Sequence, residues 1–163
     1  MPRLTLTERM ARIRKTDSRP ELMVRRAVHR LGYRFRLHRR DLPGCPDLVL
    51  PRHRKVIFVH GCFWHRHDCP DGRKLPKSKP EYWAPKLARN AARDARHVHS
   101  LSELGWDVLV LWECEMKDAA RLSNELKRFL DRPEGALAEA DRSGRATPKH
   151  QPAKPPAPRA ARM

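Results

Sequence analysis

The first regular hydrophobic pattern in this chain has the spacing of an amphipathic helix. Residues 18–21, Ser-Arg-Pro-Glu, form a capping box with a proline in the first turn, and a helical pattern follows until Gly32. The apolar positions of that pattern are Val24, Ala27, Val28 and Leu31. A cap, a helical period and a terminal glycine together predict a helix over residues 18–31.

Shorter hydrophobic runs then replace the helical spacing. Residues 33–37, 47–50 and 55–60 are rich in β-branched or aromatic side chains, and proline, glycine and charged residues separate them. We expect three short strands that are antiparallel neighbours. Residues 82–104 then lack an internal glycine and end at Gly105, which predicts a long helix.

The closing part of this pattern adds one strand and one helix. Residues 108–112 form an apolar run of strand length, and residues 118–130 have a helical pattern. The order of helix, three strands, helix, strand and helix predicts an α/β fold in which helices flank a mixed sheet of about four strands. A chain of 163 residues accommodates one such domain.

The two ends of the chain differ in composition from this central part. Residues 1–16 hold five basic side chains and little core-forming pattern, which predicts a basic N-terminal arm. From residue 132 onward, prolines and alanines lie among lysines and arginines, and no apolar face can form. We therefore expect three regions: the arm at 1–16, a folded domain at 17–131, and a disordered basic tail at 132–163.

The balance of charge indicates the class of partner. Lysine and arginine number 36 against 19 aspartates and glutamates, so the formal net charge is +17. A surplus of that size favours a polyanion, and nucleic acid is the expected one. The longest apolar runs have strand length, which excludes a transmembrane helix, and no secretory leader pattern begins the sequence. We expect a cytoplasmic location, where the four cysteines serve as thiols or metal ligands and form no disulfides.

One segment concentrates the residue types that bind zinc. Residues 60–69 contain three histidines and two cysteines at the end of an expected strand, and Cys114 follows the next strand. Zinc takes cysteine and histidine in tetrahedral sets. A closed Cys₃His site would consist of Cys62, His67, Cys69 and Cys114. Cys45 would remain a free thiol. A set of thiols without metal is the alternative, because this spacing is uncommon among zinc fingers.

Two adjacent aromatic residues, Phe63 and Trp64, lie between these candidate ligands. We place them in a loop, where both rings cannot easily face one core. In a basic DNA-binding protein, exposed rings of this kind unstack base steps and kink the duplex. Packing around the metal site is the alternative interpretation.

Three acidic residues have positions that suggest catalysis. Asp47 follows a proline at the start of an expected strand, Asp94 projects into the apolar arc of the long helix, and Glu21 borders the apolar arc of the first helix. Simpler roles are a turn aspartate for Asp47 and a capping-box glutamate for Glu21. With His60 or His65 as a proton carrier, the three acids predict Mg²⁺-dependent cleavage of phosphodiester bonds.

Several motifs together resemble one family of nucleases. They are Leu-Pro-Gly-Cys-Pro-Asp-Leu-Val at 42–49, Val-Ile-Phe-Val-His-Gly-Cys-Phe-Trp-His at 56–65 with His67 and Cys69, Asn90 to Asp94, Leu-Gly-Trp at 104–106 and Trp-Glu-Cys at 112–114. This combination is similar to the very short patch repair (Vsr) DNA mismatch endonucleases over roughly residues 7–130. The His-Gly-Cys-Phe-Trp-His string with the later Trp-Glu-Cys is highly specific.

The resemblance implies a fold, two metals and a reaction. The fold is of the type II restriction endonuclease kind, with a structural zinc and with Mg²⁺ in the active site. The reaction is the nicking of one strand 5′ to the T of a T:G mismatch, which arises when 5-methylcytosine deaminates. The location implied is the bacterial cytoplasm, at the nucleoid when the enzyme is bound to DNA.

The resemblance also implies roles for single residues at the active site. Asp47 resembles the family's metal-binding aspartate, with the backbone of Val59 as a further Mg²⁺ ligand, and His65 resembles its catalytic histidine. The supporting positions around the hydrated metal match Glu21, His60 and Asp94.

Residues outside the catalytic set match the family as well. The zinc ligands correspond to Cys62, His67, Cys69 and Cys114. Phe63 and Trp64 match aromatic residues inserted beside the mismatch, and Met10 matches an N-terminal residue that enters from the other groove. The tail from residue 132 has no counterpart in the family pattern.

The chain departs from the expected patterns in three respects. The wider nuclease pattern pairs Pro-Asp with (Asp/Glu)-x-Lys, whereas residues 58–60 read Phe-Val-His, which resembles the Vsr variant and removes the lysine from the mechanism. Cys45 stands where a basic residue is expected, and Val59 stands where threonine can occur. A metal contact through the Val59 carbonyl tolerates valine.

These observations predict an Mg²⁺-dependent endonuclease, and the resemblance implies that it acts on double-stranded DNA with a T:G mismatch. We expect a monomer, with mismatch-repair proteins as candidate partners. A zinc-stabilised DNA-binding protein without catalysis is the first alternative. A nuclease of the same fold with another DNA target is the second. The acids argue against the first alternative, because a pure binder has no use for carboxylates that face phosphate.

Overall fold

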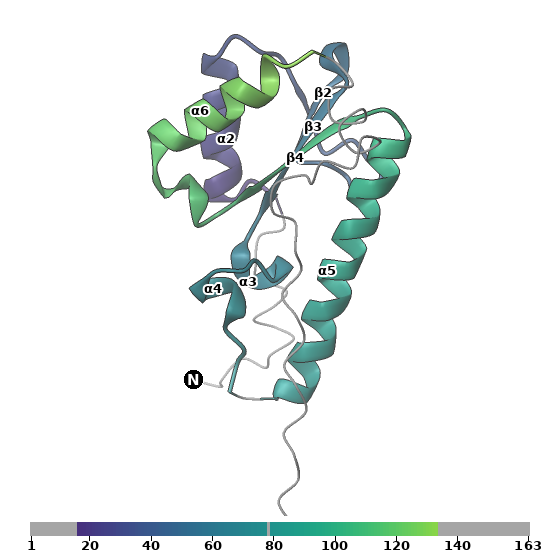
Figure 1. The fold of residues 1–163 in the computed structure, drawn as a ribbon, viewed down its shortest axis with the longest axis vertical. Coiled ribbons are helices and arrows are strands. Elements are labelled where there is room, and N and C mark those ends of the chain that lie inside the picture. The colour runs from purple at the N-terminus through teal and green to yellow at the C-terminus, as the bar shows by residue number, and fades with distance from the viewer. Residues whose placement is uncertain (1–15, 78, 134–163) are drawn as a thin grey trace, which may run out of the picture.

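Four strands form one mixed sheet at the centre of the computed structural model, which describes residues 16–77 and 79–133 (Figure 1). The strands are β1 (Arg36–Leu37), β2 (Leu48–Leu50), β3 (Lys55–His60) and β4 (Asp107–Trp112). They lie in the order β1-β2-β3-β4, antiparallel across the first two pairs and parallel between β3 and β4. The predicted mixed sheet, with its three antiparallel neighbours, is confirmed.

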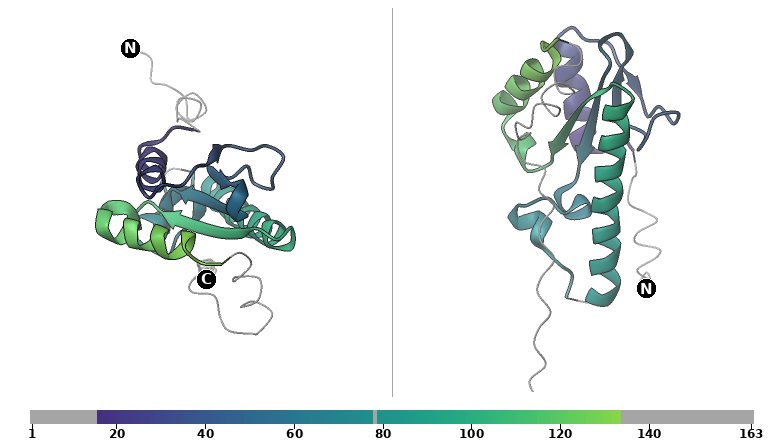
Figure 2. Two further views of the ribbon diagram at one scale, coloured as in Figure 1. Left: turned by 90° about the horizontal axis from the view of Figure 1, so that it is seen from above. Right: turned by 45° about the vertical axis from the view of Figure 1, so that its right-hand side comes forward.

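Helices cover both faces of this sheet. The long ones are α2 (Arg19–Arg30), α5 (Pro80–Glu103) and α6 (Ala119–Leu130). The short ones are α3 (Cys62–His65) and α4 (Pro70–Arg73), with 3₁₀ turns η1 (Pro51–His53) and η2 (Glu115–Lys117). α2 and α6 pack together on one face, and α5 lies along the other and extends past the end of the sheet (Figures 1 and 2). The predicted α/β layout is confirmed, whereas the short helices were not predicted.

Side chains that alternate along the strands pack into two hydrophobic cores, one on each face of the sheet. Leu48 and Ile57 belong to the core shared with α2 and α6, whereas Val49, Val56 and Phe58 belong to the core beneath α5. β2 and β3 are therefore buried on both faces, which explains why their sequences read as nearly continuous apolar runs.

The strand predicted over residues 33–37 is shorter than expected. β1 contains only residues 36 and 37, which pair with Val49 and Leu48. In the same register Arg34 would lie opposite Pro51, and proline has no N–H to donate to a sheet. The start of η1 at Pro51 therefore limits the pairing of β1.

The predicted arm at 1–16 and tail at 132–163 lie almost entirely outside the described residues, and Met10 lies outside them too. The arm, the tail and the role of Met10 therefore stay predictions. Within residues 16–77 and 79–133, no helix combines the length and the apolar character that a membrane span requires.

A buried lysine joins the sheet to α6. Lys55, the first residue of β3, is 1% exposed. Its Nζ donates hydrogen bonds to the carbonyl oxygens of Leu130 at 3.0 Å and Arg132 at 2.5 Å. Carbonyls at the end of a helix lack helical partners, and the helix dipole favours a positive charge there. The Lys55 ammonium thus fixes the C-terminus of α6 against β3.

Replacing Lys55 by methionine should lower the free energy of unfolding by about 2–4 kcal/mol, because two carbonyls lose a charged donor. Denaturation with urea measures this change. Lys127→Met, on the exposed surface of α6, is the control and should leave the unfolding free energy unchanged. Equal stability of the Lys55→Met protein and the wild type would contradict the role given to Lys55.

Candidate active site and metal centre

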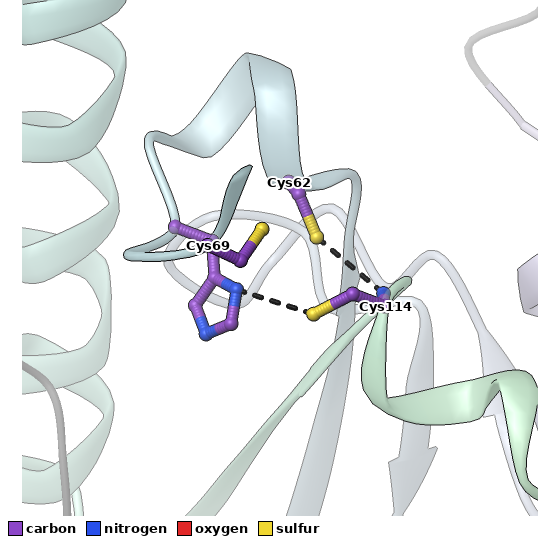
Figure 3. A group of neighbouring side chains, drawn as sticks. Cys62, Cys69 and Cys114 are labelled. Atoms are coloured by element: carbon purple, nitrogen blue, oxygen red, sulfur yellow. Dashed lines mark hydrogen bonds between the residues drawn. The ribbon is translucent and has the colours of Figure 1, made fainter. Parts of the chain in front are cut away.

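Four side chains of the types that bind zinc converge beyond the ends of β3 and β4, and Figure 3 labels the three cysteines among them. One potential ligand atom from each lies within 4.8 Å of the others, and the four residues are Cys62, His67, Cys69 and Cys114. Cys114 Sγ lies 3.3 Å from His67 Nδ1, and Cys62 Sγ accepts a hydrogen bond from the Cys114 N–H at 3.4 Å. The structure thus brings together the whole set that the sequence suggested.

The chemistry of this donor set fits zinc. A closed set of thiolate and imidazole ligands is typical of structural Zn²⁺ sites. Burial raises the pKa of the Cys62 thiol to about 12, so its thiolate needs a positive charge nearby. A zinc ion bound by the four residues would supply that charge. Cys45 lies apart from the cluster, as predicted, and lines a neighbouring cleft.

That cleft has a volume of about 630 Å³. Its lining includes all five catalytic candidates from the sequence, which are Glu21, Asp47, His60, His65 and Asp94. They come from α2, from the residue before β2, and from β3, α3 and α5. The fold therefore gathers into one cleft residues that are up to 73 positions apart in the sequence.

Pairing of β2 with β3 places Asp47 beside Val59. The two strands are antiparallel, so the start of β2 meets the end of β3. Asp47 Oδ2 accepts a hydrogen bond from the Val59 N–H at 2.7 Å. The other carboxylate oxygen, Oδ1, lies 3.9 Å from His38 Nδ1.

The environment of Asp47 favours a bound cation. Burial raises the pKa of this carboxyl to about 6, although the Val59 N–H opposes the change, and the nearby Glu21 carboxylate raises the pKa further. A buried, crowded pair of carboxylates is stabilised when a cation sits between or beside them. Carboxylate and carbonyl oxygens are also the ligands that Mg²⁺ prefers.

His65 and Asp94 form a hydrogen-bonded pair across the cleft. His65 Nδ1 lies 2.5 Å from Asp94 Oδ2, so an ionised Asp94 accepts from a protonated Nδ1. Burial by itself would raise the pKa of Asp94, but the hydrogen bond and charge of His65 outweigh it and hold that pKa below its usual value. His65 Nε2 is left as the ring atom that can take up a proton.

His60 holds the ring of His65 in place from one side. The two imidazoles are stacked, with ring centroids 3.9 Å apart and planes within 5° of each other. The edge of Trp112, at 5.3 Å between centroids, contacts His60 in turn. The orientation of His65 is therefore fixed both by a ring stack and by Asp94.

Phe63 and Trp64 lie on the short helix α3, which corrects the predicted loop. Their rings contact each other at 4.9 Å and Trp83 of α5 at 5.8 and 6.0 Å, between centroids. Both side chains remain partly exposed. A helix of four residues is too short to show a helical period, which is why the sequence pattern did not predict it.

Two residues beside the acidic side chains of the cleft, Arg25 and His38, were not predicted from the sequence. Arg25 Nη1 donates to Asp17 Oδ1 at 2.5 Å, and its Nη2 donates to Glu21 Oε2 at 3.1 Å. Its position four residues after Glu21 on one helix is a signal that the spacing offered. His38 lies in a connecting segment without any periodic pattern, and nothing in the sequence marks it.

Comparison with known proteins places these features in a family context. A sequence family described as DNA mismatch endonuclease Vsr matches residues 4–71. The chain is 52% identical over 122 residues to the type II nicking enzyme V.XorIIP of Xanthomonas oryzae pv. oryzae, covering 75% of this chain and 89% of the relative. It is 38% identical over 144 residues to the DNA mismatch endonuclease Vsr of Escherichia coli K12, covering 86% and 92%. It is 36% identical over 121 residues to the type II nicking enzyme V.NmeAIP of Neisseria meningitidis, covering 74% and 86%.

Replacing Cys62 or Cys114 by serine should reduce bound zinc from about one ion per chain to near none and should lower the melting temperature, since a structural site contributes directly to folding. Elemental analysis and thermal denaturation of the purified proteins measure both effects. Cys45→Ser is the matched control and should keep the metal. Wild-type protein that is folded and active without zinc would contradict the assignment.

Asp47→Asn should stabilise the protein against unfolding above pH 6 in the absence of added Mg²⁺. The carboxyl has a raised pKa of about 6 when folded and an ordinary value of 3.8, so ionisation costs stability as the pH rises through that window. The gain should reach about 1–3 kcal/mol, at about 1.4 kcal/mol per pKa unit. Below pH 3.8 the two proteins should be equally stable.

Urea denaturation of both proteins at pH 4 and pH 7.5 gives the comparison. Because the buried carboxylate is the source of the effect, Glu103→Gln, which changes an exposed carboxylate at the end of α5, serves as the control for a general change of net charge. A lower unfolding free energy for Asp47→Asn at pH 7.5 would show that the carboxylate stabilises the fold instead.

Proposed function

The chain belongs to the Vsr family of DNA mismatch endonucleases and is a DNA nicking endonuclease, and on that premise we propose that it nicks one strand 5′ to the T of T:G mismatches by Mg²⁺-dependent hydrolysis. The observation that carries this proposal is the His65–Asp94 pair, which shares one cleft with the Asp47 carboxylate. A proton acceptor and a hard anionic ligand in one cleft suit the hydrolysis of a phosphodiester.

Asp47 and the backbone carbonyl of Val59 are the proposed Mg²⁺ ligands. When bound, Mg²⁺ polarises the phosphate and makes a bound water more acidic. The support from this chain is the buried Asp47 carboxylate, whose pKa is raised mainly by burial and further by the nearby Glu21 carboxylate. Glu21, 5% exposed and close to Asp47, is proposed to hold water molecules of the hydrated ion.

His65 is the proposed general base. As the attacking water oxygen bonds to phosphorus, its proton passes to His65 Nε2. The phosphorus–oxygen bond to the leaving strand breaks, and the released oxygen keeps the electron pair and takes a proton from solvent water. Asp94 keeps Nδ1 protonated, so only Nε2 is available, and its negative charge stabilises the imidazolium that forms. The ring of His60 stacks on that of His65, with centroids 3.9 Å apart, and so restrains the orientation of the His65 imidazole.

Phe63 and Trp64 are the proposed mismatch readers. They occupy the two positions before His65 on one helical turn, so rings inserted beside a mispair would bring that base pair close to the catalytic histidine. Opening a stacked step costs a few kcal/mol, and less at a mispair. The net charge of +17 supplies affinity for phosphates regardless of sequence.

The decisive experiment is a nicking assay on duplexes of one sequence that carry each mismatch or none, with and without Mg²⁺. T:G duplexes should be nicked 5′ to the T only when Mg²⁺ is present, and Asp47→Asn or His65→Ala should reduce the rate by about 100-fold or more. Preferred nicking of fully paired duplexes would support a different DNA target instead. Binding without nicking would support a pure DNA-binding protein.

Phe63→Ala and Trp64→Ala should reduce the preference for T:G over T:A duplexes by about tenfold while lowering non-specific affinity much less, since base stacking is worth about 1–3 kcal/mol. Binding at one fixed salt concentration measures both. Tyr82→Ala, which removes another ring packed on Trp83, is the control and should keep the preference. Equal loss on both duplexes would show that the α3 rings serve packing alone.

A further inference from the structure

Arg25 and His38 contact the carboxylates of the cleft, and the mechanism above gives them no role. Arg25 Nη2 lies 3.0 Å from His38 Nε2, and Arg25 is held by Asp17 and Glu21. The Arg25 side chain is 12% exposed, and that of His38 is 26% exposed. The two residues therefore form a partly buried network that ends at Asp47.

The contact between them determines the tautomer of His38. A guanidinium stays protonated and has no acceptor atom, so it can only donate hydrogen bonds. His38 Nε2 must then accept from Arg25 Nη2, which requires that Nε2 carries no proton. A neutral imidazole with an accepting Nε2 carries its proton on Nδ1. Arg25 thus fixes His38 as the Nδ1–H tautomer.

This Nδ1–H faces the metal-binding candidate. His38 Nδ1 lies 3.9 Å from Asp47 Oδ1, and a shortening by about 1 Å would bring the two atoms to hydrogen-bond distance. The other oxygen of Asp47 already accepts from Val59. Hydrogen-bond donors to both oxygens of Asp47 would fix the orientation of the carboxylate plane. A ligand whose orientation is already fixed loses less conformational entropy when it binds a cation.

The backbone of His38 supports this interpretation. Its φ is +45°, in the left-handed region that side-chain-bearing residues rarely adopt. Such a conformation persists where the surrounding contacts determine it, and it concentrates at functional sites. Arg25 provides the contact that orients the ring once the backbone has presented it to the cleft.

A second metal site in the network is the competing interpretation. Potential ligand atoms of Asp17, Glu21 and His38 lie within 4.8 Å of one another. The guanidinium of Arg25 contacts all three residues, so its fixed positive charge already takes the place that a cation would need. The network therefore serves the site at Asp47.

We propose that Arg25 and His38 are positioning residues: Arg25 holds His38 as the Nδ1–H tautomer, and that N–H orients Asp47 Oδ1 for the catalytic cation. This inference rests on the proposed function, in which Asp47 binds the cation. It adds two residues to the active site that act through Asp47 and do not touch the DNA phosphate.

Two substitutions test the two ring nitrogens of His38 separately. His38→Asn keeps a donor near the position of Nδ1 but loses the group that faces Arg25. His38→Gln keeps an acceptor near the position of Nε2 but loses the donor toward Asp47. A positioning role predicts that His38→Gln is the more damaging change, whereas a merely structural partner of Arg25 predicts the reverse.

The first test measures Mn²⁺ binding to the DNA-free protein by electron paramagnetic resonance, together with the Mg²⁺ dependence of nicking. His38→Gln should weaken Mn²⁺ binding about tenfold and raise the half-maximal Mg²⁺ concentration similarly, with kcat at saturating Mg²⁺ nearly unchanged. His38→Asn should stay within about threefold of wild type. The reverse order, or equal behaviour of both variants, would overturn the inference.

The second test reads the tautomer directly. Long-range ¹H–¹⁵N spectra of the zinc-loaded protein should show His38 protonated at Nδ1, and Arg25→Met should restore the Nε2–H form in part. A wild-type Nε2–H tautomer would overturn the inference. Asp47→Asn distinguishes failure of the proposed function from failure of the positioning role. If the Asp47→Asn protein still binds Mn²⁺ and nicks DNA, the proposed function is wrong. If Asp47→Asn abolishes both while the His38 variants behave like the wild type, only the positioning role is wrong.

Discussion

The register between β2 and β3 is the constraint on which the active site depends. Leu48 pairs with Ile57, and Val49 pairs with Val56. A slip by one residue would turn every side chain of β2 to the opposite face and would move Asp47 away from Val59. The burial of these four apolar side chains stabilises the register and therefore also fixes the position of the Asp47 carboxylate. The site needs no separate stabilisation to hold Asp47, because the core already does so.

The Cys₃His cluster gives His65 a comparable support. A helix of four residues has no stability of its own, since helix formation requires a longer nucleus. α3 is held instead at Cys62, its first residue, and by the ligands that follow it. His65 lies between these fixed points and so meets Asp94 of α5. The Cys₃His cluster and His65 therefore share one short segment of chain.

The sequence allowed the elements and the chemistry to be predicted, but it did not reveal every contact. The capping box at Ser18 and the stop at Gly105 marked real helix ends, because caps and left-handed glycines are local signals. The convergence of the zinc ligands followed from strand ends that were themselves predictable. α3 and His38 escaped prediction, because their conformations depend on partners distant in the sequence and not on a local pattern. The stacking of His60 on His65 also escaped prediction, because it too is not determined by a local pattern.

The long helix α5 carries residues that contact two parts of the site. Trp83 contacts the aromatic rings of α3, and Asp94, eleven residues further along, contacts His65. At about 1.5 Å per residue the two positions are roughly 16 Å apart along the axis, and each added or removed residue would rotate one against the other by about 100°. The geometry therefore constrains the length of this stretch more strongly than its side chains. The connection between α4 and α5 carries no such constraint, because no helical phase has to be kept there.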